Sequence, residues 1–346
     1  MKEPYLSIVV TSRNDNHGGD LLKRMTAFVN GLLHQSRKFS LDAELIIVEW
    51  NPPADRPLLK DVLPKPTKED VLNIRYITVP NEIHKQYFTG KSIPLFQMIA
   101  KNVGIRRARG KFILCTNIDI LFADECMERL NKKDFKENVF YRTNRLDAEA
   151  GLLVFEKFDE QISFAKNHVI KRIGKNETLK HVRGVPDFFY NFNYPMKALD
   201  YFWGWYDKIR LGNFYELAML DTVACGDFTL MSNIAWLKID GYPELDLYSI
   251  HVDTIALYAA HLQGMKQQIF NYKECVYHIY HEEGWESIDD AIKMLNFMAR
   301  KPSLDWWLVV KATLQMLKEG KTKYNLNKPN WGFVDTKFEE HEFNAA

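Results

Sequence analysis

The sequence lacks features that would place it in several structural classes. Its 346 residues include four cysteines, none in a C-x-x-C pair, which gives no sign of a zinc ribbon or a disulfide framework. No apolar run approaches the roughly 18 residues of a membrane-spanning helix. With 17 glycines and 13 prolines the chain is neither collagen-like nor of low complexity. We therefore expect a globular protein without a transmembrane segment, located in the cytoplasm.

A strong charge of either sign is also missing. The chain has 46 basic and 45 acidic residues, a formal net charge of +1, and so gives no electrostatic reason to expect nucleic-acid binding. Aromatic residues, by contrast, are many: 22 Phe, 16 Tyr and 8 Trp. Most of them should lie in the core, although Tyr and Trp also form flat surfaces for sugars or bases.

The first 125 residues alternate between predicted strands and helices. Short, β-branched apolar runs predict buried strands at 6–11, 44–50, 74–79 and 111–116. Amphipathic helices are expected from Leu21, with Asp20 as the N-cap, and from Pro94, closed by Gly110. Strands that alternate with helices indicate an α/β protein with a mostly parallel, Rossmann-like sheet.

The second half is less regular. Its pattern predicts a strand at 226–232, a helix at 251–264, an edge strand at 275–281 and two helices between 288 and 320, followed by a polar tail. The stretch 188–214 is dense in aromatics: Tyr190, Phe192, Tyr194, Tyr201, Phe202, Trp203, Trp205 and Tyr206. These side chains suit an acceptor platform or a membrane or partner surface, but a helical subdomain core is the commoner use of such a composition.

Polar residues follow several predicted strands at their carboxyl ends, where open α/β sheets bind ligands. Asn117-Ile118-Asp119 comes directly after the fourth strand. Two oxygen-bearing side chains spaced by one residue can reach the same hard cation or a ribose hydroxyl. The same residue types also form ordinary turns, so this local pattern leaves both interpretations open.

Several motifs, taken in order, resemble family-2-like glycosyltransferases with the A-type (GT-A) fold. AKNVGI at 100–105, ARGKFIL at 108–114 and NID at 117–119 are similar to a family stretch that ends in D-x-D. LSIVVTSRND at 6–15 and IIVEW at 46–50 resemble the first two strands, and CGDFTLMSNIAWLKIDGYPE at 225–244 resembles a later block. The implied organisation is a nucleotide-sugar-binding half (1–130), an aromatic-rich insertion (131–221), an acceptor half (222–285), and C-terminal helices with a polar tail (286–346).

The resemblance assigns donor-site roles to individual residues. It implies that Thr11, Arg13 and Asp15 line the site for the nucleotide base and ribose. Glu49 stands in place of a usual Asp in that site, and Lys101 stands where the family often has an Arg near the nucleotide. Asn117 and Asp119 occupy the metal motif. Because Asn117 replaces an acid, one negative charge is lost and metal affinity should fall.

For catalysis and metal binding, the resemblance points to the second half of the chain. His251 falls where a catalytic base is expected and Asp253 is the nearby carboxylate; we favour Asp253, which could instead cap the following helix. Asp227 resembles a residue that faces the acceptor, or is a turn carboxylate. His278 and His281 are candidate metal ligands that suit Mn²⁺. In a strand running to residue 281 they would point to opposite faces, so that at most one enters the site.

The resemblance implies an enzyme that moves a sugar from a nucleotide-diphosphate sugar to a hydroxyl of a glycan, glycolipid or polysaccharide. Inversion at the sugar and assistance by Mn²⁺ or Mg²⁺ are expected. The alternative is a catalytically silent module on the same scaffold that binds a glycan or a nucleotide. A nucleotidyltransferase is disfavoured because the sequence lacks a Gly-rich loop with a Lys that cradles a triphosphate.

Overall fold

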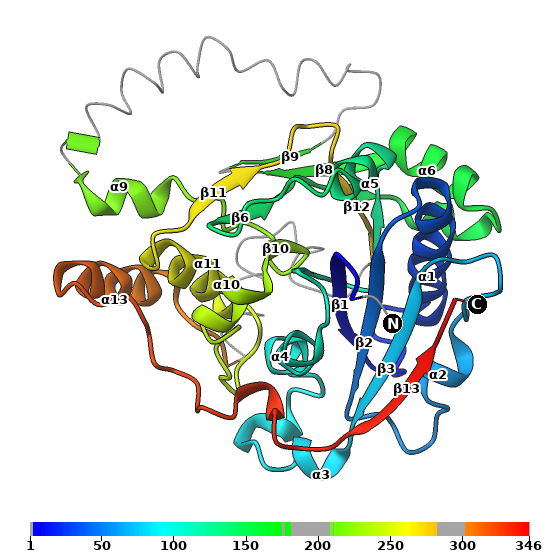
Figure 1. Cartoon of the computed structure of the whole chain (residues 1–346), viewed down its shortest axis with the longest axis horizontal. Helices are drawn as coiled ribbons and strands as arrows, with labels where there is room; N and C mark the ends of the chain where they lie inside the picture. The colour runs from blue at the N-terminus through cyan, green and yellow to red at the C-terminus, as the bar shows by residue number, and fades with distance from the viewer. Residues whose placement is uncertain (1–2, 175–176, 181–207, 210, 282–301, 346) are drawn as a thin grey trace.

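An eight-stranded, mostly parallel sheet forms the centre of the protein (Figure 1). The computed structural model describes residues 3–174, 177–180, 208–209, 211–281 and 302–345. In spatial order the strands are β11 (Lys266–Ile269), β6 (Val139–Arg142), β10 (Phe228–Ser232), β4 (Phe112–Thr116), β1 (Leu6–Ser12), β2 (Ala43–Trp50), β3 (Asn73–Val79) and β13 (Glu339–Phe343). β4, β1, β2 and β3 run parallel, whereas β10 and β13 are antiparallel to their neighbours.

A second sheet of five strands carries part of the site. Its spatial order is β5 (Ile120–Phe122), β12 (Val276–Ile279), β7 (Arg145–Ala148), β8 (Val169–Gly174) and β9 (Glu177–Lys180). β5 follows β4 along the chain after only three residues, 117–119. The stretch from Asn117 to Asp119 therefore connects the two sheets, which places its side chains between them.

Helices cover both faces of the central sheet. One face packs against α1 (Leu21–Phe39), α5 (Asp124–Asn131) and α6 (Phe158–Asn167), and the other against α4 (Gln97–Arg107), α10 (Asn233–Lys238) and α11 (Val252–Leu262). α9 (Asn213–Ala218) and α13 (Trp306–Lys318) pack with α11 in a third cluster. The short helical turns are α2 (Leu59–Val62), α3 (Asn81–His84), η1 (Phe88–Lys91), η2 (Ala150–Val154) and η4 (Trp331–Phe333).

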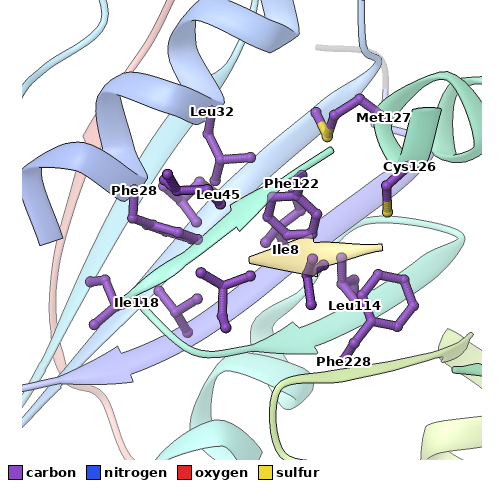
Figure 2. Close-up of a cluster of buried hydrophobic side chains, with 14 of the residues drawn as sticks. Ile8, Phe28, Leu32, Leu45, Leu114, Ile118, Phe122, Cys126, Met127 and Phe228 are labelled. Carbon is purple, nitrogen blue, oxygen red and sulfur yellow. The ribbon is translucent and has the colours of Figure 1, made fainter. Parts of the chain in front are cut away.

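The alternation of side chains along β1 explains why both faces are apolar. Ile8 belongs to the core under α1, and Val9 belongs to the core under α4. Figure 2 shows Phe28 and Leu32 of α1 over Ile8 and Leu45 of the sheet. On the other face, Gly104 lets α4 approach β1 closely, because a Cβ at position 104 would lie 2.5 Å from Val9 Cγ1.

Most predicted elements are confirmed, with boundaries shifted by a few residues, and several details are wrong. Asp20 does not cap α1: it is left-handed (φ 46°) and its side chain makes no capping hydrogen bond, pairing instead with Lys23. The helix expected from Pro94 begins at Gln97. β12 is not an edge strand, because it pairs with β5 on one side and β7 on the other.

The chain beyond residue 131 contributes more to the sheets than its composition suggested. Within 131–221, β6 joins the central sheet and β7 joins the second sheet. The polar tail ends in β13, which pairs with β3 at the edge of the central sheet. The aromatic block at 190–206 and the helix predicted near 288 lie outside the described residues. Within the described part of the chain, no helix is both long and apolar enough to cross a membrane.

Arg107 at the end of α4 holds the segment that precedes β13 by hydrogen bonds. Its guanidinium donates hydrogen bonds of 2.8 Å to the carbonyl oxygens of Gly332, Phe333 and Thr336. We expect Arg107→Ala to lower the free energy of unfolding by about 2–4 kcal/mol, because three carbonyl groups lose their donors. Denaturant unfolding and hydrogen exchange of the β13 amides would measure this.

The matched control is Arg109, whose bidentate pair with Glu342 is 41% exposed on the arginine side. Arg109→Ala should cost less than about 1 kcal/mol, because exposed ion pairs contribute little. Equal losses in the two variants would contradict the anchoring role of Arg107.

Candidate functional site

A cavity of about 680 Å³ opens at the carboxyl ends of β1 and β4. Ten of the side chains predicted from the sequence line it: Thr11, Arg13, Asp15, Asn117, Asp119, Asp227, His251, Asp253, His278 and His281. They come from the ends of β1 and β12, from the loops after β1, β4 and β12, from the segment before β10 and from the start of α11. Strand order thus brings residues from distant parts of the sequence into one site.

Glu49 and Lys101 do not line this cavity. Glu49 is 1% exposed and accepts a hydrogen bond from the backbone N–H of Leu59, and burial raises the pKa of its carboxyl to about 7. Lys101 is fully buried behind the wall and donates to Asn117 Oδ1 (2.9 Å) and to the carbonyl oxygen of Gly226 (2.7 Å). In this structure Lys101 positions a cavity residue and is not itself exposed to a ligand.

Three side chains in the cavity form a potential metal-binding group: Asp119, His278 and His281. The Nε2 atoms of both histidines lie 3.6 Å from Asp119 Oδ2. Two atoms that each lie about 2.1 Å from one ion at the tetrahedral angle are about 3.4 Å apart, so this spacing needs only a small contraction to enclose a cation. Two imidazoles and a carboxylate suit Mn²⁺ and related transition metals.

Both histidines enter the site, contrary to the expectation from strand alternation. The reason is that β12 ends at Ile279, so His281 lies beyond the strand and its direction is no longer set by the pleat. Gly18 makes room for it, because a Cβ there would lie 2.7 Å from His281 Nδ1. The wrong boundary of this strand therefore led to the wrong number of histidines in the site.

The charges around Asp119 compensate one another. Burial by itself would raise the pKa of Asp119, but His278, Arg24 and His281 hold it well below its usual range. Burial and Arg145 work to lower the pKa of His278, yet Asp119 and Asp147 raise it to about 10. Burial lowers the pKa of His281 to about 4, so this imidazole is neutral. A metal ion would have to displace the proton of His278 before it could bind there.

Arg24 is a site residue that the motifs did not reveal. It is 1% exposed, and its Nη1 donates to Asp119 Oδ2 at 2.9 Å, while Nη2 donates to the carbonyl oxygens of His17 and Gly19. The signal in the sequence is its position three residues after Leu21 and four before Phe28, on the apolar face of α1. A cation on a buried helix face needs an anionic partner, and here that partner is Asp119.

Arg145 and Asp147 on β7 were also missed. Strand register places Asp147 beside His278, with Asp147 Oδ1 3.2 Å from His278 Nδ1, and Arg145 Nη2 lies 2.9 Å from the same ring nitrogen. Arg145 Nε donates to the same Asp147 oxygen at 2.7 Å, and its Nη1 donates to Asp227 Oδ2 at 2.7 Å. A carboxylate on the far nitrogen of a histidine ligand fixes the orientation of the ring, which is the position Asp147 has here.

Asn117 and Asp227 have their polar atoms occupied by neighbours. The amide of Asn117 accepts from Lys101 through Oδ1 and donates to Asp227 Oδ1 through Nδ2. Asp227 accepts from Asn117 and Arg145 with its two oxygens, so it is held by side chains and not by a backbone turn. The Oδ1 atom of Asn117 is therefore engaged by the Lys101 ammonium.

Asp253 and His251 lie at the start of α11. His251 precedes the helix in a left-handed conformation (φ 62°) with no capping hydrogen bond. Asp253 does not cap the helix either: its Oδ1 accepts a hydrogen bond from the N–H of Thr254, the next residue. Burial raises the pKa of Asp253 and lowers that of His251. The carboxylate of Asp253 is therefore a stronger base than that of an ordinary Asp, and the imidazole of His251 binds a proton less readily than that of an ordinary His.

The end of β1 supplies the remaining predicted residues. Thr11 is 3% exposed and its hydroxyl donates to the carbonyl oxygen of Val48. Arg13 donates to the carbonyl oxygen of Asn51 and pairs with Asp15 at 3.2 Å. Because Arg13 and Asp15 are partly exposed in the cavity, they remain available to a ligand.

Comparison with protein-family models gives no match for this chain, and comparison with curated proteins gives none either. Function must therefore be inferred from the geometry of the cavity together with the motif resemblance.

The metal-binding group can be tested by titrating the protein with Mn²⁺. We expect one bound ion per chain and a release of protons on binding, since His278 carries a proton in the free protein. His281→Ala should weaken binding by more than about tenfold, because it removes one of three ligands. His34→Ala, a change on the surface of α1, should leave binding unchanged; similar affinities in all three proteins would remove the group as a metal site.

Asp147 is not one of the three proposed ligands, but its carboxylate lies against His278 and should orient that ring. Asp147→Asn keeps the shape of the side chain but removes the charge that orients His278. Mn²⁺ affinity should fall by about 10- to 100-fold. Asp159→Asn, at an exposed position on α6, is the charge-matched control, and thermal melting would show whether each variant is folded. An unchanged Mn²⁺ affinity in Asp147→Asn would exclude this orienting role.

Proposed function

We propose that this chain is a metal-assisted glycosyltransferase that uses a nucleotide-diphosphate sugar. The observation that carries the proposal is the convergence of Asp119, His278 and His281 in the cavity that also holds Asp253. A divalent cation on one wall would offset the charge of the departing diphosphate, and a carboxylate base on another would take the proton of the acceptor hydroxyl. The motif resemblance of the first strands and of residues 100–119 points to the same reaction.

The residues divide into groups that bind the donor and a group that moves a proton. Arg13 and Asp15 would contact the nucleotide at the end of β1. Asp119, His278 and His281 would hold Mn²⁺ or Mg²⁺, which when bound offsets the negative charge of the diphosphate leaving group. Arg24 and Arg145 stay buried beside this group and hold its acidic side chains in place.

In the transfer itself, the acceptor hydroxyl oxygen forms a bond to the anomeric carbon of the donor sugar. The bond between that carbon and the phosphate oxygen breaks, and its electron pair stays on the departing nucleoside diphosphate. Asp253 accepts the proton of the hydroxyl. A single displacement of this kind inverts the configuration at the anomeric carbon.

The donor half of the proposal is tested by calorimetric titration with UDP, GDP and ADP, each with and without Mn²⁺. At least one nucleotide should bind, and should bind more tightly with the cation. Asp119→Asn keeps the side-chain volume and should remove the effect of Mn²⁺, whereas Asp124→Asn at the start of α5 should not. If no nucleotide binds under either condition, the glycosyltransferase proposal fails.

The catalytic half predicts that Asp253→Asn lowers kcat by about 10²- to 10⁴-fold with donor affinity unchanged, because only the base is lost. His251→Asn should have a much smaller effect; the reverse order would make His251 the base. Since the carboxylate form is active, activity should fall as pH drops through the pKa of Asp253. That pKa is raised by burial, so the acidic limb should lie above the range of an ordinary Asp.

Binding without turnover is the second function that a specific observation favours. Asn117 replaces an acid of the D-x-D motif, and its oxygen is engaged by Lys101. A chain that binds a nucleotide diphosphate but neither transfers nor hydrolyses its sugar would be a binding module on the same scaffold.

A further inference from the structure

The cavity has two walls of different chemistry. The carboxyl ends of β1, β4 and β12, the loops after them and the start of α11 provide charged and imidazole side chains. α9 with the residues after it, Tyr258 of α11 and the start of α13 provide apolar ones. The apolar wall consists of Leu217, Leu220, Tyr258 and Trp306, all members of one hydrophobic cluster or packed against it. Among the described residues of α9 and α13, no charged side chain lines the cavity.

The apolar wall is a poor match for a purely hydrophilic acceptor. A sugar can stack on one ring, such as Trp306, but Leu217 and Leu220 cannot bond its hydroxyl groups. Hydroxyl groups that lose water without gaining partners make binding unfavourable. A hydrocarbon segment against the same side chains binds favourably, because both the hydrocarbon and the side chains are removed from water.

The apolar surface continues from the cavity to the outside of the protein. Trp306 packs edge-on against Trp307, with ring centroids 4.7 Å apart, and Trp307 stacks on Phe214 of α9 at 6.2 Å. Trp307 is 53% exposed and Leu308 is 60% exposed. Both helices lie at the left of Figure 1, away from α1. The apolar wall and the exposed side chains of Trp307 and Leu308 therefore form one continuous apolar path from the cavity to the protein surface.

The charge beside this path favours a lipid over another protein. Lys311 follows Trp307 by one helical turn and is exposed, and Lys318 is exposed two turns further on. A helix face that combines Trp and Leu with lysines is the composition that lies at the interface of a lipid layer.

We infer that the acceptor is an amphipathic lipid with a hydroxyl-bearing head group. Its head group sits near Asp253, and its hydrocarbon chain lies along Leu217, Leu220 and Trp306 and leaves the cavity over Trp307 and Leu308. This assignment rests on the proposed glycosyl transfer, because it names the acceptor of that reaction.

Calorimetric titration with methyl, butyl and octyl β-glucoside, each kept below its micelle concentration, tests the inference. The sugar is constant in this series, so only the chain varies. Affinity should rise with chain length, by up to about fourfold for each methylene that is buried. Equal affinities for methyl and octyl glucoside, or no binding of octyl glucoside, would overturn the inference.

Variants of the protein test where the hydrocarbon chain of the glucoside lies within the cavity. Trp306→Ala should lower the affinity for octyl glucoside by about tenfold or more. Trp306→Phe, which keeps an apolar ring, should retain most of that affinity. Val154→Ala changes a 78% exposed apolar residue on η2 and should have no effect. If Trp306→Ala binds octyl glucoside like the unmodified protein, the assigned path is wrong.

These titrations contain neither nucleotide nor metal. They can therefore fail while the nucleotide titrations succeed, which would leave a glycosyltransferase with a different acceptor. The opposite result, chain-dependent glucoside binding without nucleotide binding, would remove the proposed reaction but keep the lipid site.

Discussion

The burial of charge at the junction of the two sheets is the constraint on which the site depends. Asp119, Asp147 and Asp227 are all less than one-tenth exposed, and an isolated buried carboxylate would be strongly unfavourable. Each is paired: Arg24 bonds Asp119, and Arg145 bonds both Asp147 and Asp227. His278 lies between Asp119 and Asp147 and completes the network. Its members come from the second sheet, from the segments that follow β4 and precede β10 of the central sheet, and from α1, so the network links the two sheets.

The network also determines what a cation would encounter. Arg24 and a protonated His278 already offset the charge of Asp119. A metal ion that binds there therefore replaces the proton of His278 as a positive charge beside Asp119. Asn117 belongs to a different part of the network, where Lys101 supplies the positive charge. An acid at position 117 would face that ammonium and Asp227 at once. The amide satisfies both, since it accepts from one neighbour and donates to the other.

The second feature with functional consequences is the separation of polar and apolar walls. The charged wall comes from the ends of the parallel strands, as is general for open α/β sheets. The apolar wall comes from α9, α13 and the face of α11 that packs against them, which form a separate hydrophobic cluster. A site built in this way suits the joining of two unlike molecules, one anionic and one amphipathic.

Much of the fold was predictable from local pattern. Runs of apolar residues and 3.6-residue spacing identified β1 to β4, α1, α4, β10 and α11, because burial of each element depends on its own periodicity. β13 was not predicted, since its polar sequence EEHEF is only partly buried at an edge and is held by pairing with β3. β12 was predicted to end two residues later than it does, and this error changed the expected direction of His281.

From the sequence alone it follows that an N-x-D tripeptide comes after a buried strand and that candidate ligands exist at 278 and 281. The sequence also identified Arg13 and Asp15 after the first strand, but it did not reveal Arg24 or Arg145. Which of these side chains meet depends on the arrangement of the strands in space. The pairing of β12 with β5 and β7 brings residues 119, 147 and 278 together, although they are far apart along the chain. Side-chain spacing follows from local geometry, but contact between strands follows from sheet order, which no single segment encodes.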